Sequence, residues 1–207
     1  MGLGPSELSF TTMKPDNIPT SNCPRVVALG KSNVGKSTLL NSMLHPQKLF
    51  RSGKTPGLTR GILGAKVKLG KSLDSQIELI DVPGYGFAAN VHAREEWGSL
   101  MGSLKEKSVE EPLLLMILVE GGRVPSPEDM ELLKWVGQIP YVLVFTKADK
   151  VKGQNRTKAL VEWKKFADGS IQTPFWVSVL KNEGLDQLQK FVRNFSKWNV
   201  GLEVSKK

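Results

Sequence analysis

An eight-residue stretch, Gly30-Lys31-Ser32-Asn33-Val34-Gly35-Lys36-Ser37, has the residue types and the spacing of a loop that binds phosphate. It follows a short apolar run and precedes a helical pattern, which is the context that G-x-x-x-x-G-K-S requires. Its glycines let the backbone curl, so that N–H groups point inward at phosphate oxygens. Lys36 would bridge the β- and γ-phosphates of a nucleoside triphosphate, and the Ser37 hydroxyl would bind Mg²⁺. Residues 30–37 are called the phosphate loop below.

A second group of residues is suited to sensing a metal ion and the γ-phosphate. Asp81-Val82-Pro83-Gly84 ends an apolar run, so the Asp81 carboxylate is expected at the sheet edge where ligands bind and would hold Mg²⁺ through water. The Gly84 N–H can reach the γ-phosphate. Thr59, between these two elements in the chain, can offer its hydroxyl to Mg²⁺ and its N–H to the γ-phosphate. Thr55 is an alternative for that role.

The third group predicts which base is bound. Thr146-Lys147-Ala148-Asp149 directly follows the apolar run Tyr141–Phe145. A carboxylate at Asp149 can accept hydrogen bonds from both N1–H and the 2-amino group of guanine, which adenine cannot match. The Lys147 stem would pack over the ring, and a backbone N–H within Ser178-Val179-Leu180 would meet the guanine O6. These elements, in this order, predict a guanine-nucleotide-binding domain.

The elements that position these groups alternate between short strands and helices, which is typical of an α/β fold with a parallel sheet. Strands buried on both faces are predicted, together with an edge strand at Gly64–Leu69. Trp135, Trp163 and Trp198 are expected to pack helices against the sheet. The predicted buried strands are Arg25–Leu29, Gln76–Asp81, Leu113–Glu120, Tyr141–Phe145 and Phe175–Val179, and the predicted helices are Lys36–Leu44, Val91–Lys107, Pro127–Val136, Arg156–Phe166 and Leu185–Trp198.

Composition is that of a basic globular chain: 29 Lys and Arg against 20 Asp and Glu give a net charge of +9 on 207 residues. The charge is concentrated in two basic blocks, residues 45–72 and residues 147–165, which favours a polyanionic partner over a uniformly solvated surface. The single cysteine, Cys23, excludes a disulfide framework. The longest apolar run, Leu113–Val119, is too short to span a membrane. Neither a signal peptide nor a lipidation sequence is expected.

On these motifs the chain resembles the EngB-type ribosome-biogenesis GTPases of the Ras-like P-loop class over roughly residues 10–198. Besides the phosphate loop, the resemblance depends on Thr55-Pro56-Gly57-Leu58-Thr59, Asp81-Val82-Pro83-Gly84-Tyr85-Gly86 and Thr146-Lys147-Ala148-Asp149. It implies a mostly parallel six-stranded sheet with about five helices on both faces. It also implies GTP and Mg²⁺ binding and a role in assembling the large ribosomal subunit.

The resemblance implies a role for each residue that matches a family motif. Lys36, Thr59 and Gly84 are implied as catalytic, and Ser37 and Thr59 as Mg²⁺ ligands. Leu58 stands where the family usually has a basic residue, Glu120-Gly121-Gly122-Arg123 replaces an Asp-x-Arg-His run, and Val179 replaces a small residue. The implied GTP contacts are Gly30, Lys31, Ser32, Asn33, Val34, Gly35, Lys36, Ser37, Gly57, Leu58, Thr59, Arg60, Gly61, Asp81, Val82, Pro83, Gly84, Thr146, Lys147, Ala148, Asp149, Val177, Ser178 and Val179.

Hydrolysis is expected to be slow without help, because Tyr85 stands where Ras-like enzymes have a water-orienting glutamine. Tyr85 is equally well interpreted as a packing aromatic. Asn33 matches a residue that helps some GTPases bind K⁺, so either K⁺ or the ribosomal partner is expected to raise the rate. His92 is interpreted as a solvated helix residue and not as a catalytic base.

Three functions remain in competition. The first is a GTP-controlled assembly factor that contacts ribosomal RNA, with the basic segment 45–72 overlapping the nucleotide-responsive residues. The second is a signalling or trafficking GTPase with a protein effector. The third, a nucleotide kinase, is disfavoured by Thr146–Asp149. We expect a cytoplasmic monomer, of bacterial or organellar origin, with an N-terminal extension (1–22, partly flexible), a GTP-binding domain (23–199) and a flexible tail (200–207).

Overall fold

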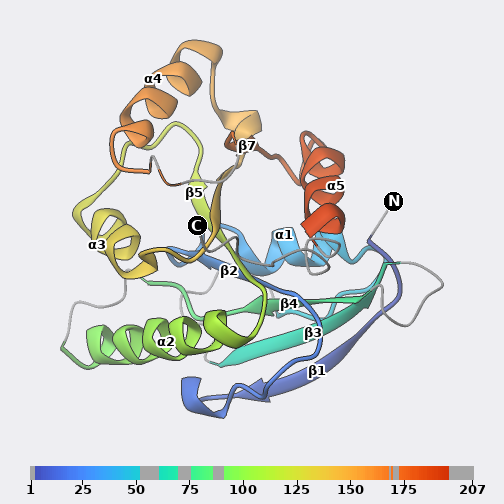
Figure 1. Cartoon of the computed structure of the whole chain (residues 1–207). Helices are drawn as coiled ribbons and strands as arrows, with labels where there is room; N and C mark the ends of the chain where they lie inside the picture. The colour runs from blue at the N-terminus through green and yellow to red at the C-terminus, as the bar shows by residue number, and fades with distance from the viewer. Residues whose placement is uncertain are drawn as a thin grey trace, which may run out of the picture.

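Seven strands form one sheet in the order β1-β3-β4-β2-β5-β6-β7 (Figure 1). The computed structural model describes residues 3–51, 61–69, 76–85, 91–167, 169 and 173–195. The strands are β1 (Ser6–Thr12), β2 (Arg25–Gly30), β3 (Ile62–Lys68), β4 (Gln76–Asp81), β5 (Leu113–Glu120), β6 (Tyr141–Thr146) and β7 (Phe175–Trp176). The helices are η1 (Pro15–Asn17), α1 (Lys36–Met43), α2 (Val91–Glu110), α3 (Pro127–Val136), η2 (Ala148–Lys150), α4 (Gly153–Lys164) and α5 (Leu185–Phe195).

Five neighbouring strands of the sheet, β4, β2, β5, β6 and β7, run parallel to one another, as the alternation of strands and helices predicts. Because helices cover both faces, the central strands are buried on both sides. In β2, Val26 and Ala28 pack on the face that α1 and α5 cover. Val27 and Leu29 pack on the opposite face, under α2, α3 and α4. The α/β fold with helices on both faces is therefore confirmed.

The described residues form a sheet of seven strands, so the expected number of six is wrong. The additional strand is β1, which lies within the predicted N-terminal extension and pairs antiparallel with β3. It also makes β3 an interior strand, because β3 pairs with β4 on its other side. The prediction that residues 64–69 form an edge strand is therefore wrong. Serine, threonine and glutamate dominate β1, and its side chains are mostly exposed, so it has no apolar run by which to recognise it.

Several boundaries differ from those predicted. β7 is only two residues long, because Ser178 instead forms a bridge with Glu183. Helix α4 begins and ends earlier than expected, and α2 continues to Glu110. Trp163 is fully buried and Trp135 is partly buried, both against the sheet, as predicted, whereas Trp198 lies outside the described residues. In the part of the chain that is described, no helix is both long and apolar enough to cross a bilayer.

A buried ion cluster joins the amino ends of the central strands, opposite the edge where ligands are expected. Arg25, at the start of β2, is 1% exposed. Its guanidinium donates to Glu78 of β4 at 2.7 Å, to Glu111 after α2 at 2.5 Å, and to the carbonyl of Pro19. The two carboxylates compensate the buried cation, and the cluster ties three distant segments together.

Candidate functional site

The phosphate loop connects the end of β2 to the start of α1, at the carboxyl edge of the parallel strands. Gly35, which precedes the first turn of α1, has a φ of 109°, and Asn33 has a φ of 62°. Both lie in the left-handed region, which glycine and asparagine adopt more readily than other residues. The backbone therefore curls over the amino end of α1, where the helix dipole favours an anion.

Lys36 lies inside this curl. Its side chain is buried, and its ammonium donates to the carbonyl of Gly30 at 3.0 Å and to that of Lys31 at 3.3 Å. Burial lowers the pKa of Lys36 to about 8, and the charge of Asp81 opposes that shift. A desolvated ammonium held by two neutral carbonyls is well suited to bind a phosphate oxygen, which is a stronger acceptor.

Asp81, the last residue of β4, is fully buried beside the phosphate loop. Its Oδ2 accepts a hydrogen bond from the Ser37 hydroxyl at 2.5 Å, whereas no described residue contacts its Oδ1 by a hydrogen bond. Burial raises the pKa of Asp81 to about 6, against the hydrogen bond from Ser37 and the charge of Lys36. A buried carboxylate with an unpartnered oxygen next to a hydroxyl fits Mg²⁺, which prefers oxygen ligands.

The segment after β4 crosses the phosphate loop. The amide of Ser32 donates to the carbonyl of Tyr85 at 3.0 Å, and the Ser32 hydroxyl donates to the carbonyl of Gly84 at 3.3 Å. A Cβ atom on Gly84 would lie 2.6 Å from the Ser32 amide nitrogen, so only glycine allows this approach. Among residues 57–61, only Gly61, just before β3, is described; Thr59, Gly57, Leu58 and Arg60 lie outside the described residues, as do Thr55 and the His92 side chain.

A cavity of about 300 Å³ extends from the phosphate loop to the segments that follow β6 and β7. Asn33, Gly35, Thr146, Lys147 and Asp149 line it, so the structure brings the first and third predicted groups to one place. Of the 178–180 segment, Val179 and Leu180 line the cavity. Its lining also includes three residues that the sequence motifs did not assign to GTP binding: Thr38, Leu39 and Lys150. Each directly follows a motif residue or its neighbour in the chain, and that adjacency is the signal by which they could have been found.

Hydrogen bonds hold the segment after β6 in its place. Thr146 donates from its hydroxyl to the carbonyl of Val34 at 2.7 Å, which joins this segment to the phosphate loop. Lys147 has a φ of 53°, and its ammonium pairs with Glu120 at 2.8 Å. Asp149 accepts from the Ser178 hydroxyl at 2.5 Å, a bond that lowers the pKa of the carboxyl. Asp149 is thus oriented in its charged form at the cavity, as recognition of guanine requires.

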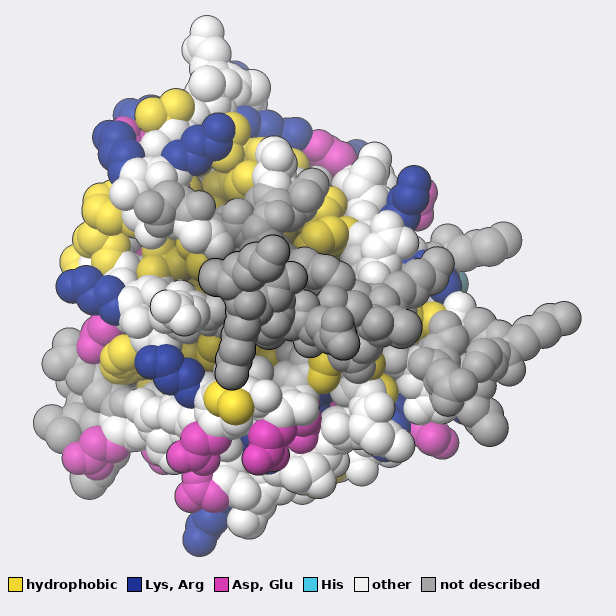
Figure 2. Space-filling view, viewed as in Figure 1, with side chains coloured by type: hydrophobic (Ala, Val, Ile, Leu, Met, Phe, Trp, Pro, Cys, Tyr) yellow, Lys and Arg dark blue, Asp and Glu magenta, His cyan; other side chains and the backbone are white. Residues whose placement is uncertain are grey.

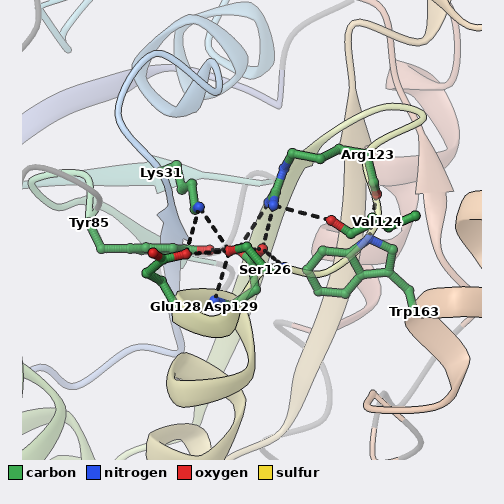
Figure 3. A network of polar contacts seen from close by, with 8 residues as sticks. All are labelled: Lys31, Tyr85, Arg123, Val124, Ser126, Glu128, Asp129 and Trp163. Atoms are coloured by element: carbon green, nitrogen blue, oxygen red, sulfur yellow. Dashed lines mark hydrogen bonds and ion pairs between the residues drawn. The ribbon is translucent and has the colours of Figure 1, made fainter.

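The side chain of Tyr85 is buried. Its ring meets that of Trp97 edge to face at a centroid distance of 5.4 Å. Its hydroxyl donates to Asp129 at the start of α3 at 2.6 Å (Figure 3). This confirms the interpretation of Tyr85 as a packing aromatic.

Comparison of the chain with known proteins finds relatives along most of its length. The protein-family model described as "50S ribosome-binding GTPase" matches residues 25–147. A probable GTP-binding protein EngB of Fusobacterium nucleatum is 34% identical over 171 residues, which cover 79% of this chain and 82% of the relative. A protein of the same description from Halothermothrix orenii is 35% identical over 187 residues, covering 86% and 88% of the two chains.

Solved structures share the fold. A single-residue variant of Aquifex aeolicus Era, bound to GDP and AlF₄⁻, is 26% identical with a TM-score of 0.64; the match covers 83% of this chain and 56% of that one. A probable GTP-binding protein engB is 20% identical with a TM-score of 0.62, and the match covers 84% of this chain and 99% of that one. At that identity, the second likeness concerns the fold alone.

Proposed function

Since this chain belongs to the EngB family of GTP-binding proteins, we propose that GTP binding and hydrolysis control its association with the large ribosomal subunit or its precursor. The chain is a GTPase by family, and the ribosomal role is the proposal. The observation that carries the nucleotide part is the cavity that joins the phosphate loop to Asp149. In this proposal one nucleotide lies along the cavity, with its base at the Asp149–Ser178 pair and its phosphates on the phosphate loop, where Lys36 lies.

In this proposal the phosphate loop holds the α-, β- and γ-phosphates through its backbone N–H groups and Lys36. Mg²⁺ would be held by the hydroxyls of Ser37 and Thr59, with Asp81 acting through water. When bound, the ion neutralises phosphate charge in the transition state. The Gly84 amide would donate to the γ-phosphate, because its segment already lies across the phosphate loop. Val177, Val179 and the segment 146–149 would enclose the guanine.

The nucleotide site is tested by titrating the full chain with GTP, GDP and ATP in the presence and absence of Mg²⁺. We expect selective binding of guanine nucleotides, and tighter binding of a GTP analogue with Mg²⁺ than without it. Lys36→Ala should lose at least about a hundredfold in affinity for both GTP and GDP, because it removes the cation from between the phosphates. Preferential binding of ATP would contradict the assignment and favour a kinase.

K⁺ is proposed as an accelerator of hydrolysis, through Asn33 beside the phosphates. The test measures turnover at equal ionic strength in K⁺ and in Na⁺, with Asn33→Ala as the matched variant. Faster turnover in K⁺ that the variant loses supports this role for Asn33. Equal turnover in the two salts contradicts it, and then the ribosomal partner remains as the proposed activator.

Ribosomal RNA is proposed as the second polyanion that the protein binds. The description of the matching family supports a ribosomal partner, and Era has been crystallised with part of 16S ribosomal RNA. The basic block 147–165 supports it too, because α4 and the residues around it expose Lys150, Lys152, Lys158, Lys164 and Lys165. Figure 2 shows Lys and Arg side chains over the α4 part of the molecule. Much of the other block, residues 45–72, lies outside the described residues.

Sedimentation of the protein with ribosomal particles tests the ribosomal role. With a GTP analogue, we expect co-sedimentation with large-subunit particles that weakens with GDP and with rising salt, because each phosphate contact releases counterions. The double variant Lys158→Glu/Lys164→Glu should weaken binding, whereas Lys190→Glu, exposed on α5, serves as a control for charge reversal. Binding only to non-ribosomal proteins would favour a signalling or trafficking GTPase instead. A monomeric state and a cytoplasmic location are part of the proposal.

A further inference from the structure

The backbone of Gly84 and Tyr85 is attached to the phosphate loop, as described above. Lys31 and Tyr85 form a parallel bridge, and the Ser32 amide donates to the Tyr85 carbonyl. These contacts hold the backbone of Tyr85 against the phosphate loop, while its side chain reaches the amino end of α3. The position of Gly84, whose amide would meet the γ-phosphate, therefore also depends on what holds the Tyr85 side chain.

Asp129 holds that side chain from the opposite side. Its Oδ1 accepts from the Tyr85 hydroxyl at 2.6 Å, and the Asp129 side chain is 1% exposed. Burial by itself would raise the pKa of Asp129, but hydrogen bonds from Arg123, Tyr85 and the Ser126 amide outweigh it and keep the pKa low. Asp129 is therefore a charged acceptor, and hydrogen bonds to charged groups are stronger than those between neutral groups.

Asp129 is itself firmly placed. It closes a capping box with Ser126 at the amino end of α3, and Arg123 donates to both of its oxygens. The carbonyl of Arg123 in turn accepts from the indole of Trp163 at 2.8 Å. Lys31, the second residue of the phosphate loop, reaches the same turn and contacts Ser126 at 2.8 Å and Glu128 at 3.1 Å (Figure 3). The amino end of α3 is thus a rigid support to which both the phosphate loop and Tyr85 are bound.

We propose that Asp129 is a positioning residue for the GTP-bound state: by accepting the Tyr85 hydroxyl, it holds the Gly84 amide over the phosphate loop. Asp129 acts through Tyr85 and touches no part of the nucleotide. Tyr85, turned toward α3, does not orient the attacking water. GDP lacks the γ-phosphate, so its affinity does not depend on this support. The inference rests on the proposed GTP site and adds a residue that the sequence motifs do not include.

Tyr85→Phe tests the proposal, because it removes the hydroxyl and keeps the ring against Trp97. We expect the affinity for a non-hydrolysable GTP analogue and the single-turnover hydrolysis rate each to fall about tenfold, the size expected for one hydrogen bond to a charged group. The affinity for GDP should stay within about twofold of wild type, since GDP makes no γ-phosphate contact. Asp129→Asn should likewise lower the affinity for the GTP analogue relative to the affinity for GDP. It provides a second test if Tyr85→Phe does not fold.

Tyr141→Phe is the matched control, because Tyr141 is also buried but lies at the amino end of β6, away from the site. It should leave the ratio of GTP-analogue to GDP affinity unchanged, whatever it does to the unfolding temperature. Equal losses of GTP-analogue and GDP affinity in Tyr85→Phe, or no change in either, would overturn the proposal. Failure of the wild-type chain to bind guanine nucleotides would overturn the proposed function instead, and the wild-type titration alone reveals that outcome.

Discussion

The hydroxyl of Ser178 donates to a carboxylate oxygen of Asp149 at 2.5 Å, which joins the segment after β7 to the segment after β6. The two residues are 29 positions apart in the chain. The bond leaves Asp149 charged and fixes the direction of its carboxylate at the cavity. The arrangement orients one acceptor group for the two adjacent donors of a guanine edge.

Asp149→Asn should relax the preference for guanine, because an amide cannot accept both hydrogen bonds from the base. We expect GTP affinity to fall about a hundredfold while ATP affinity changes little. Competition binding with the two nucleotides measures the ratio. Ser178→Ala, which keeps the carboxylate but loses its orienting hydroxyl, should give a smaller fall. An unchanged GTP-to-ATP ratio in Asp149→Asn would contradict the assignment of base recognition.

Gly84→Ala should impair GTP hydrolysis without weakening nucleotide binding in general. The added methyl would lie 2.6 Å from the Ser32 amide nitrogen, so the segment must move away from the phosphate loop. We expect hydrolysis to slow at least about tenfold, by loss of one transition-state donor, with GDP affinity nearly unchanged. Gly98→Ala on α2 is the matched control, since a methyl there meets nothing within 4 Å. Normal hydrolysis by Gly84→Ala would show that the close approach is unnecessary.

Arg25→Met should destabilise the fold without affecting the nucleotide site. The change leaves Glu78 and Glu111 buried without their cation, which costs about 3–5 kcal/mol of unfolding free energy. Chemical denaturation measures the loss, and GTP affinity of the folded variant should match wild type because the cluster lies at the opposite edge of the sheet. Adding Glu78→Gln and Glu111→Gln should restore part of the stability. If the added substitutions destabilise the fold further, the uncompensated charge of the two buried carboxylates is not the cause.

The pH dependence of unfolding should report the charged state of Asp129. Because the folded protein holds the pKa of Asp129 below its ordinary value, the stabilisation is fully present above about pH 4. It is lost as the pH falls further, through the folded-state pKa. The difference in unfolding free energy between wild type and Asp129→Asn should therefore stay constant above about pH 5 and shrink as the pH falls below about 4. Asp16→Asn, at an exposed position in η1, is the control for the loss of one carboxyl group. If the difference in unfolding free energy between wild type and Asp129→Asn stays constant with pH, Asp129 is not charged in the folded protein.

Most elements that carry the site were predictable from the sequence because their signals are local. The ranges of β4, β5 and α3 agree with the prediction to the residue. Continuous apolar runs mark the strands that are buried on both faces, and Ser126 with Pro127 marks the start of α3. The order of the motifs then indicates which groups meet at the carboxyl edge of the sheet, because parallel strands all end there.

Other parts of the site had no local signal. In the sequence Asp129 is one of several acidic residues near α3, and nothing in its neighbourhood indicates that it receives the hydroxyl of Tyr85, 44 positions earlier. The residues of β1 are likewise too polar to indicate a strand. They form one because they pair with β3 at the edge of the sheet, and that edge exists only in the folded protein.

Residue types within a few positions of one another were enough to determine the phosphate loop, the ends of β4 and β6, and the alternation of strands and helices. The tertiary structure was needed to decide which edge β1 covers, how Arg25 is neutralised, and that Tyr85 turns to Asp129 instead of the nucleotide. These are pairings between distant segments. Their stability comes from burial and from hydrogen bonds that exist only once the sheet and its helices have assembled.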